Sequence, residues 1–157
     1  MIEPCRTTET SGWLALRMAL WPHDGPEEHL AEMASFLAEP KRFAQYVAYD
    51  DCALPVGLIE IALRHDHVNG TSTSPVAFLE GIYVVADRRR QGVARALVNV
   101  AEVWARGHGC SEFASDASVD NAASHQMHRA LGFEESQRVV YFRKPLSPVA
   151  SHRRETR

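Results

Sequence analysis

A basic turn with two small residues is the segment of this chain best suited to bind an anion. Residues 88–95 read Arg-Arg-Arg-Gln-Gly-Val-Ala-Arg, between an apolar run (76–86) and an apolar helical run that begins at Val93. The backbone N–H groups of such a turn and of the following helix N-terminus point at one anion, and the helix macrodipole adds to the attraction. Gly92 and Ala94 leave room for a diphosphate to approach the backbone. The sequence patterns of a P-loop and of a Rossmann dinucleotide site are absent. The alternative to an anion site is a solvated basic turn that only caps the helix.

Two carboxylates lie on or beside predicted strands that flank this turn. Alternation along residues 76–86 places Phe78, Glu80, Ile82 and Val84 on one face. An ionised carboxylate there is costly unless it is paired or opens into a cleft. Asp116 ends the next strand, at the sheet edge where α/β proteins bind ligands. A shared cleft would attract a cation; the alternatives are a salt bridge from Glu80 to an arginine and a helix cap at Asp116.

The charge of the chain favours a cationic partner over a nucleic acid. The net charge is −3, and residues 147–157 carry three arginines and one glutamate, so the remainder has a charge of −5. Nucleic-acid binding requires a broad basic face, which an acidic body with one basic turn does not offer. No apolar run is long enough to span a membrane, and the N-terminus lacks the pattern of a signal peptide. Three cysteines without a CxxC pair fit a reducing, cytoplasmic environment and argue against a structural zinc site.

Hydrophobic periodicity predicts a mixed α/β domain over residues 1–146, followed by a basic, disordered tail over 147–157. Helices are expected from Thr7 or Thr8 to Leu20, from 27 to 38, from 93 to 106 and from 120 to 131. Strands are expected over 1–6, 43–48, 56–63, 76–86, 113–115 and 139–142. This order contains one βαβ crossover around the basic turn and a second around Gly132.

Four features of the sequence together resemble the GCN5-related N-acetyltransferase superfamily. They are the basic turn, the strand segment Glu80-Gly81-Ile82-Tyr83-Val84, Asn121 and the segment Leu131-Gly132-Phe133. The resemblance covers about residues 1–145. It implies a mixed, mostly antiparallel sheet that splays at the acetyl-CoA site, with about four flanking helices and no metal. The residues it assigns to acetyl-CoA are Ile82, Tyr83, Val84, Arg89, Arg90, Gln91, Gly92, Val93, Ala94, Arg95 and Asn121.

A narrower resemblance is to the aminoglycoside 6′-N-acetyltransferases of enterobacterial type. It rests on Leu20-Trp21-Pro22, residues 64–70, Ser74-Pro75, residues 78–82, Ala114-Ser115-Asp116 and Gly132-Phe133-Glu134-Glu135. It implies acetyl transfer to the 6′-amino group of an aminoglycoside antibiotic. Gln137 departs from the family, which often has a glutamate there, and His67 replaces a frequent tyrosine. The implied acceptor-site residues are Trp21, His23, Asp24, His67, Glu80, Asp116 and Gln137.

The expected reaction is direct attack of an amine on the thioester. Glu80 or Asp116 would attract and deprotonate the ammonium, and the N–H of Tyr83 or Val84 would stabilise the oxyanion. No general acid is assigned: His128 stands where the superfamily often has a tyrosine, and Tyr141 is a second candidate.

Other interpretations remain open at this stage. Trp21 could be a core residue, His23 and Asp24 loop residues, and Asn121 a helix start. The protein could acetylate another amine, such as a polyamine or a protein N-terminus, or it could sense acyl-CoA without catalysis. A homodimer is expected, because superfamily members commonly pair and an exposed sheet edge allows it.

Overall fold

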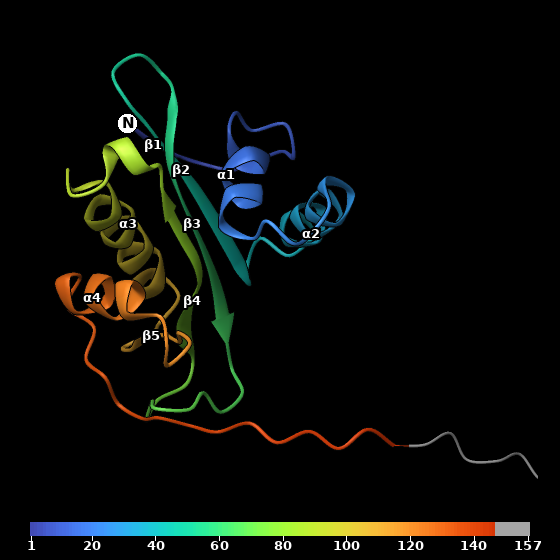
Figure 1. Cartoon of the computed structure of the whole chain (residues 1–157), viewed down its shortest axis with the longest axis vertical. Coiled ribbons are helices and arrows are strands. Elements are labelled where there is room, and N and C mark those ends of the chain that lie inside the picture. The colour runs from blue at the N-terminus through green and yellow to red at the C-terminus, as the bar shows by residue number, and fades with distance from the viewer. Residues whose placement is uncertain (147–157) are drawn as a thin grey trace, which may run out of the picture.

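One mixed five-stranded sheet forms the centre of the molecule (Figure 1). The structure, a computed structural model, describes residues 1–146; the predicted basic tail at 147–157 lies outside this range. The strands are β1 (Ile2–Pro4), β2 (Phe43–Tyr49), β3 (Pro55–Arg64), β4 (Val76–Val84) and β5 (Phe113–Ser115), in that spatial order. Neighbours from β1 to β4 are antiparallel, and β5 is parallel to β4. The predicted fold class is confirmed.

Helices cover both faces of the sheet. Helices α1 (Trp13–Leu20) and α2 (Pro26–Ala38) lie on one face, and α3 (Val93–Gly107) and α4 (Ala122–Ala130) lie on the other (Figure 1). The apolar residues of β3 alternate between the two layers: Leu58 joins the core under α1 and α2, whereas Ile59 and Ile61 join the core under α3. The sheet is therefore buried on both faces, and a ligand must enter at an edge or at a gap between strands.

A β-bulge at Glu80 interrupts β4. Glu60 pairs with Gly81 and Ile61 pairs with Leu79, so Glu80 is an extra residue without a partner on β3. An extra residue reverses the facing of every side chain beyond it. Bulges often re-aim a side chain beside an active site, and here the bulged residue is one of the two predicted carboxylates.

The bulge overturns the prediction that Phe78, Glu80, Ile82 and Val84 share one face. Ile82 packs against the same core as Leu79, under α3, whereas Phe78 belongs to a separate cluster with Val68 and Val76. Simple alternation would have placed Leu79 and Ile82 on opposite faces. The two halves of β4 are therefore out of phase.

Beyond the bulge, β4 also parts from β5. The two strands pair only from Ala77 with Phe113 to Leu79 with Ser115, while β4 continues to Val84. Among residues 1–146, no strand pairs with the segment 80–84 on the side that β5 leaves. This opening agrees with the splay that the superfamily resemblance implied.

Two predicted elements differ from the structure. Helix α1 begins after Gly12, not at Thr7 or Thr8, because Gly12 adopts a left-handed conformation (φ 80°) against Pro55 and residues 7–12 form turns. The predicted strand 139–142 is wrong, and with it the second crossover around Gly132. Residues 134–146 are extended and unpaired (Figure 1), because a strand needs a neighbouring strand and these residues leave the body of the fold.

Candidate active site

The basic turn presents a helix N-terminus with free backbone donors. A short 3₁₀ helix (Ala86–Arg88) precedes it, and Gly92 caps α3 with φ 85° and no side-chain hydrogen bond. The first N–H bonded within α3 is that of Ala96, to the carbonyl of Gly92, so the N–H groups of residues 93–95 have no helical partner. No atom lies within 4 Å of the position that a Cβ of Gly92 would occupy. The site fits a diphosphate, which needs close approach to donors of this kind.

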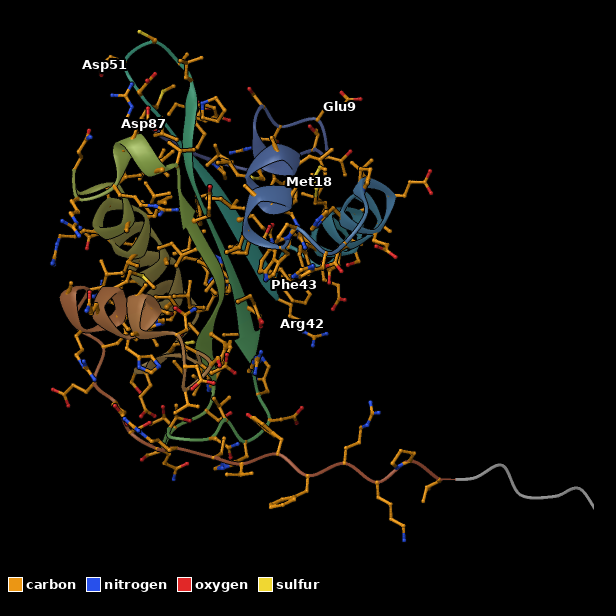
Figure 2. The ribbon with its side chains drawn as sticks, in the orientation of Figure 1. Glu9, Met18, Arg42, Phe43, Asp51 and Asp87 are labelled. Atoms are coloured by element: carbon orange, nitrogen blue, oxygen red, sulfur yellow. The ribbon has the colours of Figure 1, made fainter. Side chains whose placement is uncertain are left out.

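Packing on β3 fixes the start of α3. A Cβ at Gly57 would lie 2.9 Å from the Val93 side chain, so the missing side chain lets the first turn of α3 rest on the sheet. Figure 2 shows Asp87, which belongs to the 3₁₀ helix, at the same end of the molecule as Asp51. The donors of the turn are therefore held by the sheet rather than by a mobile loop.

The arginines of the turn have different roles. Arg88 pairs with Asp50 at 2.8 Å, and the Leu54 and Cys52 N–H groups together with Arg88 lower the pKa of this carboxyl. Arg89 donates to the Val84 carbonyl at 2.9 Å, and Arg95 donates to the carbonyl at position 130. Within residues 1–146, Arg90 alone of the four has no ion-pair or hydrogen-bond partner, and its φ is 61°. Arg90 is thus the turn arginine most available to an anion.

Backbone donors of β4 line the opening left by β5. The N–H of Val85 bonds to the carbonyl of Val56 at 3.0 Å, which fixes the alternation of hydrogen-bonded pairs along β3 and β4. By this alternation the N–H of Tyr83 faces β3, and the N–H groups of Ile82 and Val84 face the opening. Of the two oxyanion donors expected from sequence, the geometry therefore favours Val84 and leaves Tyr83 committed to the sheet.

Trp21 lies against the bulge rather than in the core. A Cβ at Gly81 would lie 2.5 Å from Cη2 of Trp21, so the indole rests directly on the β4 backbone. Trp21 is partly exposed. Its ring and the carboxylate of Glu80 therefore border the same stretch of β4, as the substrate-site interpretation requires.

Glu80 is paired within the protein. Its Oε1 accepts a hydrogen bond from Arg64 at 2.8 Å, and the Arg64 guanidinium lies 3.5 Å from the centre of the Phe78 ring. The alternative interpretation of a salt bridge to an arginine is thus realised. The side chain of Glu80 is nevertheless 32% exposed, so a cation from solvent can still reach the carboxylate.

Asp116 follows β5 and is exposed. Its carboxylate makes no hydrogen bond or ion pair with the rest of the described chain, so it is an uncompensated negative charge at the end of the splay. Asn121 caps α4, where its side chain accepts the Ser124 N–H at 3.0 Å. This is the helix-start alternative, and it occupies the side-chain oxygen of Asn121.

Four of the predicted acceptor residues are exposed, and within residues 1–146 their side chains make no hydrogen bond or ion pair with Glu80 or Asp116. His23 and Asp24 lie in the turn between α1 and α2, and His67 lies in the loop after β3. Gln137 is in the extended segment after α4, just beyond Ser136, whose hydroxyl lies close against Gly70. These four assignments stay predictions, as do those of Trp21, Glu80 and Asp116.

A buried charged network behind Trp21 was missed in the sequence. Glu60 on β3 accepts hydrogen bonds from Trp13 Nε1 at 2.6 Å and from Arg17 at 3.0 and 3.2 Å, and Arg17 also pairs with Glu32. Burial raises the pKa of Glu60 to about 7, opposed by Arg17 and Trp13. The available signal was a glutamate between two isoleucines in an apolar strand, Ile59-Glu60-Ile61.

The network supports the position of Trp21. The Arg17 guanidinium lies 5.0 Å from the Trp21 ring centre and 5.3 Å from that of Phe36. Buried His29 contacts Arg17 Nε at 3.4 Å, and its Nε2 lies 3.2 Å from the Trp21 carbonyl. Arg17 of α1 therefore holds the ring of Trp21, and His29 of α2 holds its backbone carbonyl.

Comparison with known proteins agrees with this geometry. Residues 10–133 match the model of the acetyltransferase (GNAT) family. The chain belongs to the GNAT acetyltransferase family. GNAT acetyltransferases take their acetyl group from acetyl-CoA, so acetyl-CoA is the cosubstrate of this chain. None of the helices within residues 1–146 has the length and hydropathy required to cross a bilayer. The same residues contain no group of three or more His, Cys, Asp or Glu side chains arranged to hold a metal ion.

Several relatives within this GNAT family carry a specific name. An aminoglycoside N(6′)-acetyltransferase type 1 from Acinetobacter baumannii is 50% identical over 91% of this chain and 97% of its own length. The crystal structure of the 6′-N-acetyltransferase AAC(6′)-Ih from Acinetobacter baumannii has a TM-score of 0.89 at 48% identity, covering 94% of this chain and 99% of that one. The structure of AAC(6′)-Iy in complex with the bisubstrate analogue CoA-S-monomethyl-acetylneamine has a TM-score of 0.87 at 39% identity, covering 93% and 98%.

Proposed function

We propose that the protein is an aminoglycoside 6′-N-acetyltransferase, which transfers the acetyl group of acetyl-CoA to the 6′-amino group of aminoglycoside antibiotics and so confers resistance. The observation that carries the proposal is the opening between β4 and β5, with an anion-binding turn near one end and acidic side chains at the other. Relatives at about 50% identity bear this name. The acidic end suits a polycationic sugar rather than a neutral acceptor.

In the proposed reaction the turn holds the diphosphate of acetyl-CoA, and the splay receives its thioester arm. Glu80 and Asp116 attract the 6′-ammonium, and one of them accepts its proton, directly or through water. The amine nitrogen then attacks the thioester carbon, and the N–H of Val84 stabilises the oxyanion. The C–N bond forms, the C–S bond breaks and its electron pair leaves with sulfur. Holding both reactants together supplies much of the rate enhancement.

The test is release of CoA thiol from acetyl-CoA in the presence of kanamycin or tobramycin, with NMR of the product to locate the acetyl group. Acetylation at the 6′-nitrogen is expected. No thiol release above background would refute the proposal, and a large preference for a polyamine or a peptide N-terminus would replace it. Tight CoA binding without turnover on any amine would indicate a sensor.

Variants of the two carboxylates separate acceptor binding from donor binding. Glu80→Gln or Asp116→Asn should raise the aminoglycoside KM or lower kcat by about tenfold or more, because each removes a charge that faces the ammonium. The Kd for CoA, measured by calorimetry, should stay within about twofold. An equal loss of CoA affinity would show that these residues belong to the donor site.

We also propose a homodimer. The extended segment after α4 carries large apolar side chains in solvent: Val140, Tyr141 and Phe142 are 77, 80 and 94% exposed. β-branched and aromatic residues in an extended, unpaired conformation suit pairing with a second copy, because that would bury them and complete their backbone hydrogen bonds. A dimer mass in light scattering is expected, and Tyr141→Asp should yield a monomer. A monomeric wild-type protein would refute this proposal.

A cytoplasmic location is proposed from the cysteines. Cys5, Cys52 and Cys110 are all free thiols, two of them buried, and burial raises the pKa of Cys5 and Cys110. Free thiols of this kind suit a reducing compartment. Cell fractionation tests the proposal, and recovery outside the cytoplasm would contradict it.

A further inference from the structure

A serine and a histidine form a hydrogen-bonded pair at the mouth of the splay. His128 Nε2 on α4 lies 2.8 Å from Ser115 Oγ, at the end of β5. His128 Nδ1 lies 2.8 Å from the carbonyl oxygen of Ser124. The Ser124 hydroxyl lies farther from Nδ1, at 3.2 Å. Because the nearer carbonyl only accepts hydrogen bonds, we assign a hydrogen to Nδ1, and Nε2 is then the nitrogen that exchanges a proton with the serine.

Aromatic packing holds the imidazole in this orientation. The ring of Phe133 meets the His128 ring edge-on, with centres 5.2 Å apart and planes at 74°. Phe133 in turn packs on Phe113 of β5 at 5.3 Å. The hydrogen bond to the Ser124 carbonyl and the packing of the Phe133 ring together hold the imidazole so that Nε2 faces Ser115.

The position of Ser115 gives this pair access to the reacting group. Ser115 pairs with Leu79 in the last rung between β4 and β5 and directly precedes Asp116. A thioester that extends from the turn at 88–95 along the free edge of β4 meets this rung at the end of the opening. Ser115 and His128 are both half-buried, so water can still reach the pair.

Breakage of the C–S bond creates a need that the carboxylates do not meet. The leaving sulfur takes the electron pair of the bond, and negative charge develops on it; since alkyl thiols have a pKa of about 8.5, a proton donor can stabilise this charge near neutral pH. A proton delivered to sulfur in the transition state lowers this barrier. Glu80 and Asp116 face the ammonium, and one of them accepts its proton.

We propose that Ser115 is the proton donor to the leaving sulfur and that His128 resupplies its proton. In the imidazolium form, Nε2–H donates to Ser115 Oγ, whose hydroxyl then points at sulfur. As the C–S bond breaks, the serine proton moves to sulfur and the Nε2 proton moves to the serine oxygen. The products are free CoA thiol, intact Ser115 and neutral His128, which regains a proton from solvent. This inference rests on the acetyl transfer proposed above.

The test compares Ser115→Ala, Ser115→Thr and His128→Gln with wild type, with Ser118→Ala as the matched control, since the Ser118 hydroxyl makes no hydrogen bond within the described residues. Loss of a general acid costs about 10²-fold or more in rate. With acetyl-CoA, kcat of Ser115→Ala and His128→Gln should fall by about 10²-fold, while KM and the CoA Kd change less than threefold. Ser115→Thr should recover most of the activity.

A donor with a more acidic thiol separates a chemical role from a structural one. An S-acetyl arylthiol needs no protonation on leaving, so on this donor the variants should approach wild-type kcat. The proposal is wrong if Ser115→Ala retains more than a third of kcat with acetyl-CoA, or if its loss is the same on both donors. Any amine that the wild type acetylates serves as acceptor, so failure with aminoglycosides would refute the proposed function and leave this test intact.

Discussion

Replacement of Glu60 by glutamine should remove a pH dependence from the stability of the protein. Glu60 is 2% exposed, and its pKa is raised from the ordinary value of 4.5 to about 7, mainly by burial. Arg17 opposes this shift, but Arg17 is shared with Glu32, whose charge raises the pKa further. The nearby Cys5 and His29 are also buried. Burial therefore outweighs the single shared cation.

The sign and size follow from proton linkage. Between pH 4.5 and about 7 the folded protein holds a proton on Glu60 that the unfolded chain has lost. The free energy of unfolding therefore falls as the pH rises through this range, and Glu60 adds no further pH dependence outside it. At about 1.4 kcal/mol for each pKa unit, the decrease is about 3 kcal/mol. Glu60→Gln keeps the shape of the side chain and lacks this titration.

Urea unfolding followed by tryptophan fluorescence at several pH values between 4 and 8 measures the effect. The stability difference between wild type and Glu60→Gln should change by about 3 kcal/mol across the range, in favour of the variant at higher pH. Glu9→Gln is the control, because Glu9 is exposed in the turn before α1 (Figure 2), and its profile should run parallel to wild type. If the stability of Glu60→Gln varies with pH in parallel with that of wild type, the reasoning is refuted. If wild type instead gains stability relative to Glu60→Gln as the pH rises, Arg17 outweighs burial and lowers the pKa of Glu60.

Two further substitutions probe the walls of the site. Gly81→Ala should displace the Trp21 ring, which lies 2.5 Å from the new Cβ, and so raise the aminoglycoside KM about tenfold with CoA binding unchanged. Gly107→Ala is the matched control, because its new Cβ meets no atom within 4 Å. Equal kinetics for the two variants would contradict a role of Trp21 in acceptor binding. Arg90→Ala should weaken CoA binding by about three- to tenfold in calorimetry, since a surface charge contact contributes about 1 kcal/mol, and the loss should shrink at high salt. A salt-independent loss would mean that Arg90 shapes the turn instead.

The sequence was informative where function depends on local backbone geometry. The basic turn, the start of α3 at Val93 and the short strand 113–115 were predicted from residue types alone, because helix starts and β-propensity are local properties. The splay and the fold class came from the family resemblance, which the GNAT match confirms.

What the sequence did not reveal depends on contacts between distant segments. The bulge at Glu80 arises from the pairing of β3 with β4. Its local signal is Gly81 within β4, but a glycine in a strand equally indicates the close approach of another group, as Trp21 makes here. The ion network joins residues from α1, α2 and β3, up to 47 positions apart. The segment 139–142 has the composition of a strand, but a strand forms only where a neighbour accepts its hydrogen bonds. Each of these errors comes from reading one segment without its partner.

If Glu80 binds the acceptor amine as proposed, its pairing with Arg64 makes the protein its own competitor for that carboxylate. The Arg64 guanidinium is already bonded to this carboxylate and stacked on Phe78, where the proposal places the substrate ammonium. An incoming amine must share this carboxylate or displace the arginine. A monoamine gains little from such an exchange, because one cation replaces another, whereas a ligand with several ammonium groups can also contact exposed Asp116. On this proposal, Arg64 sets a threshold in ligand charge below which the site is poorly occupied.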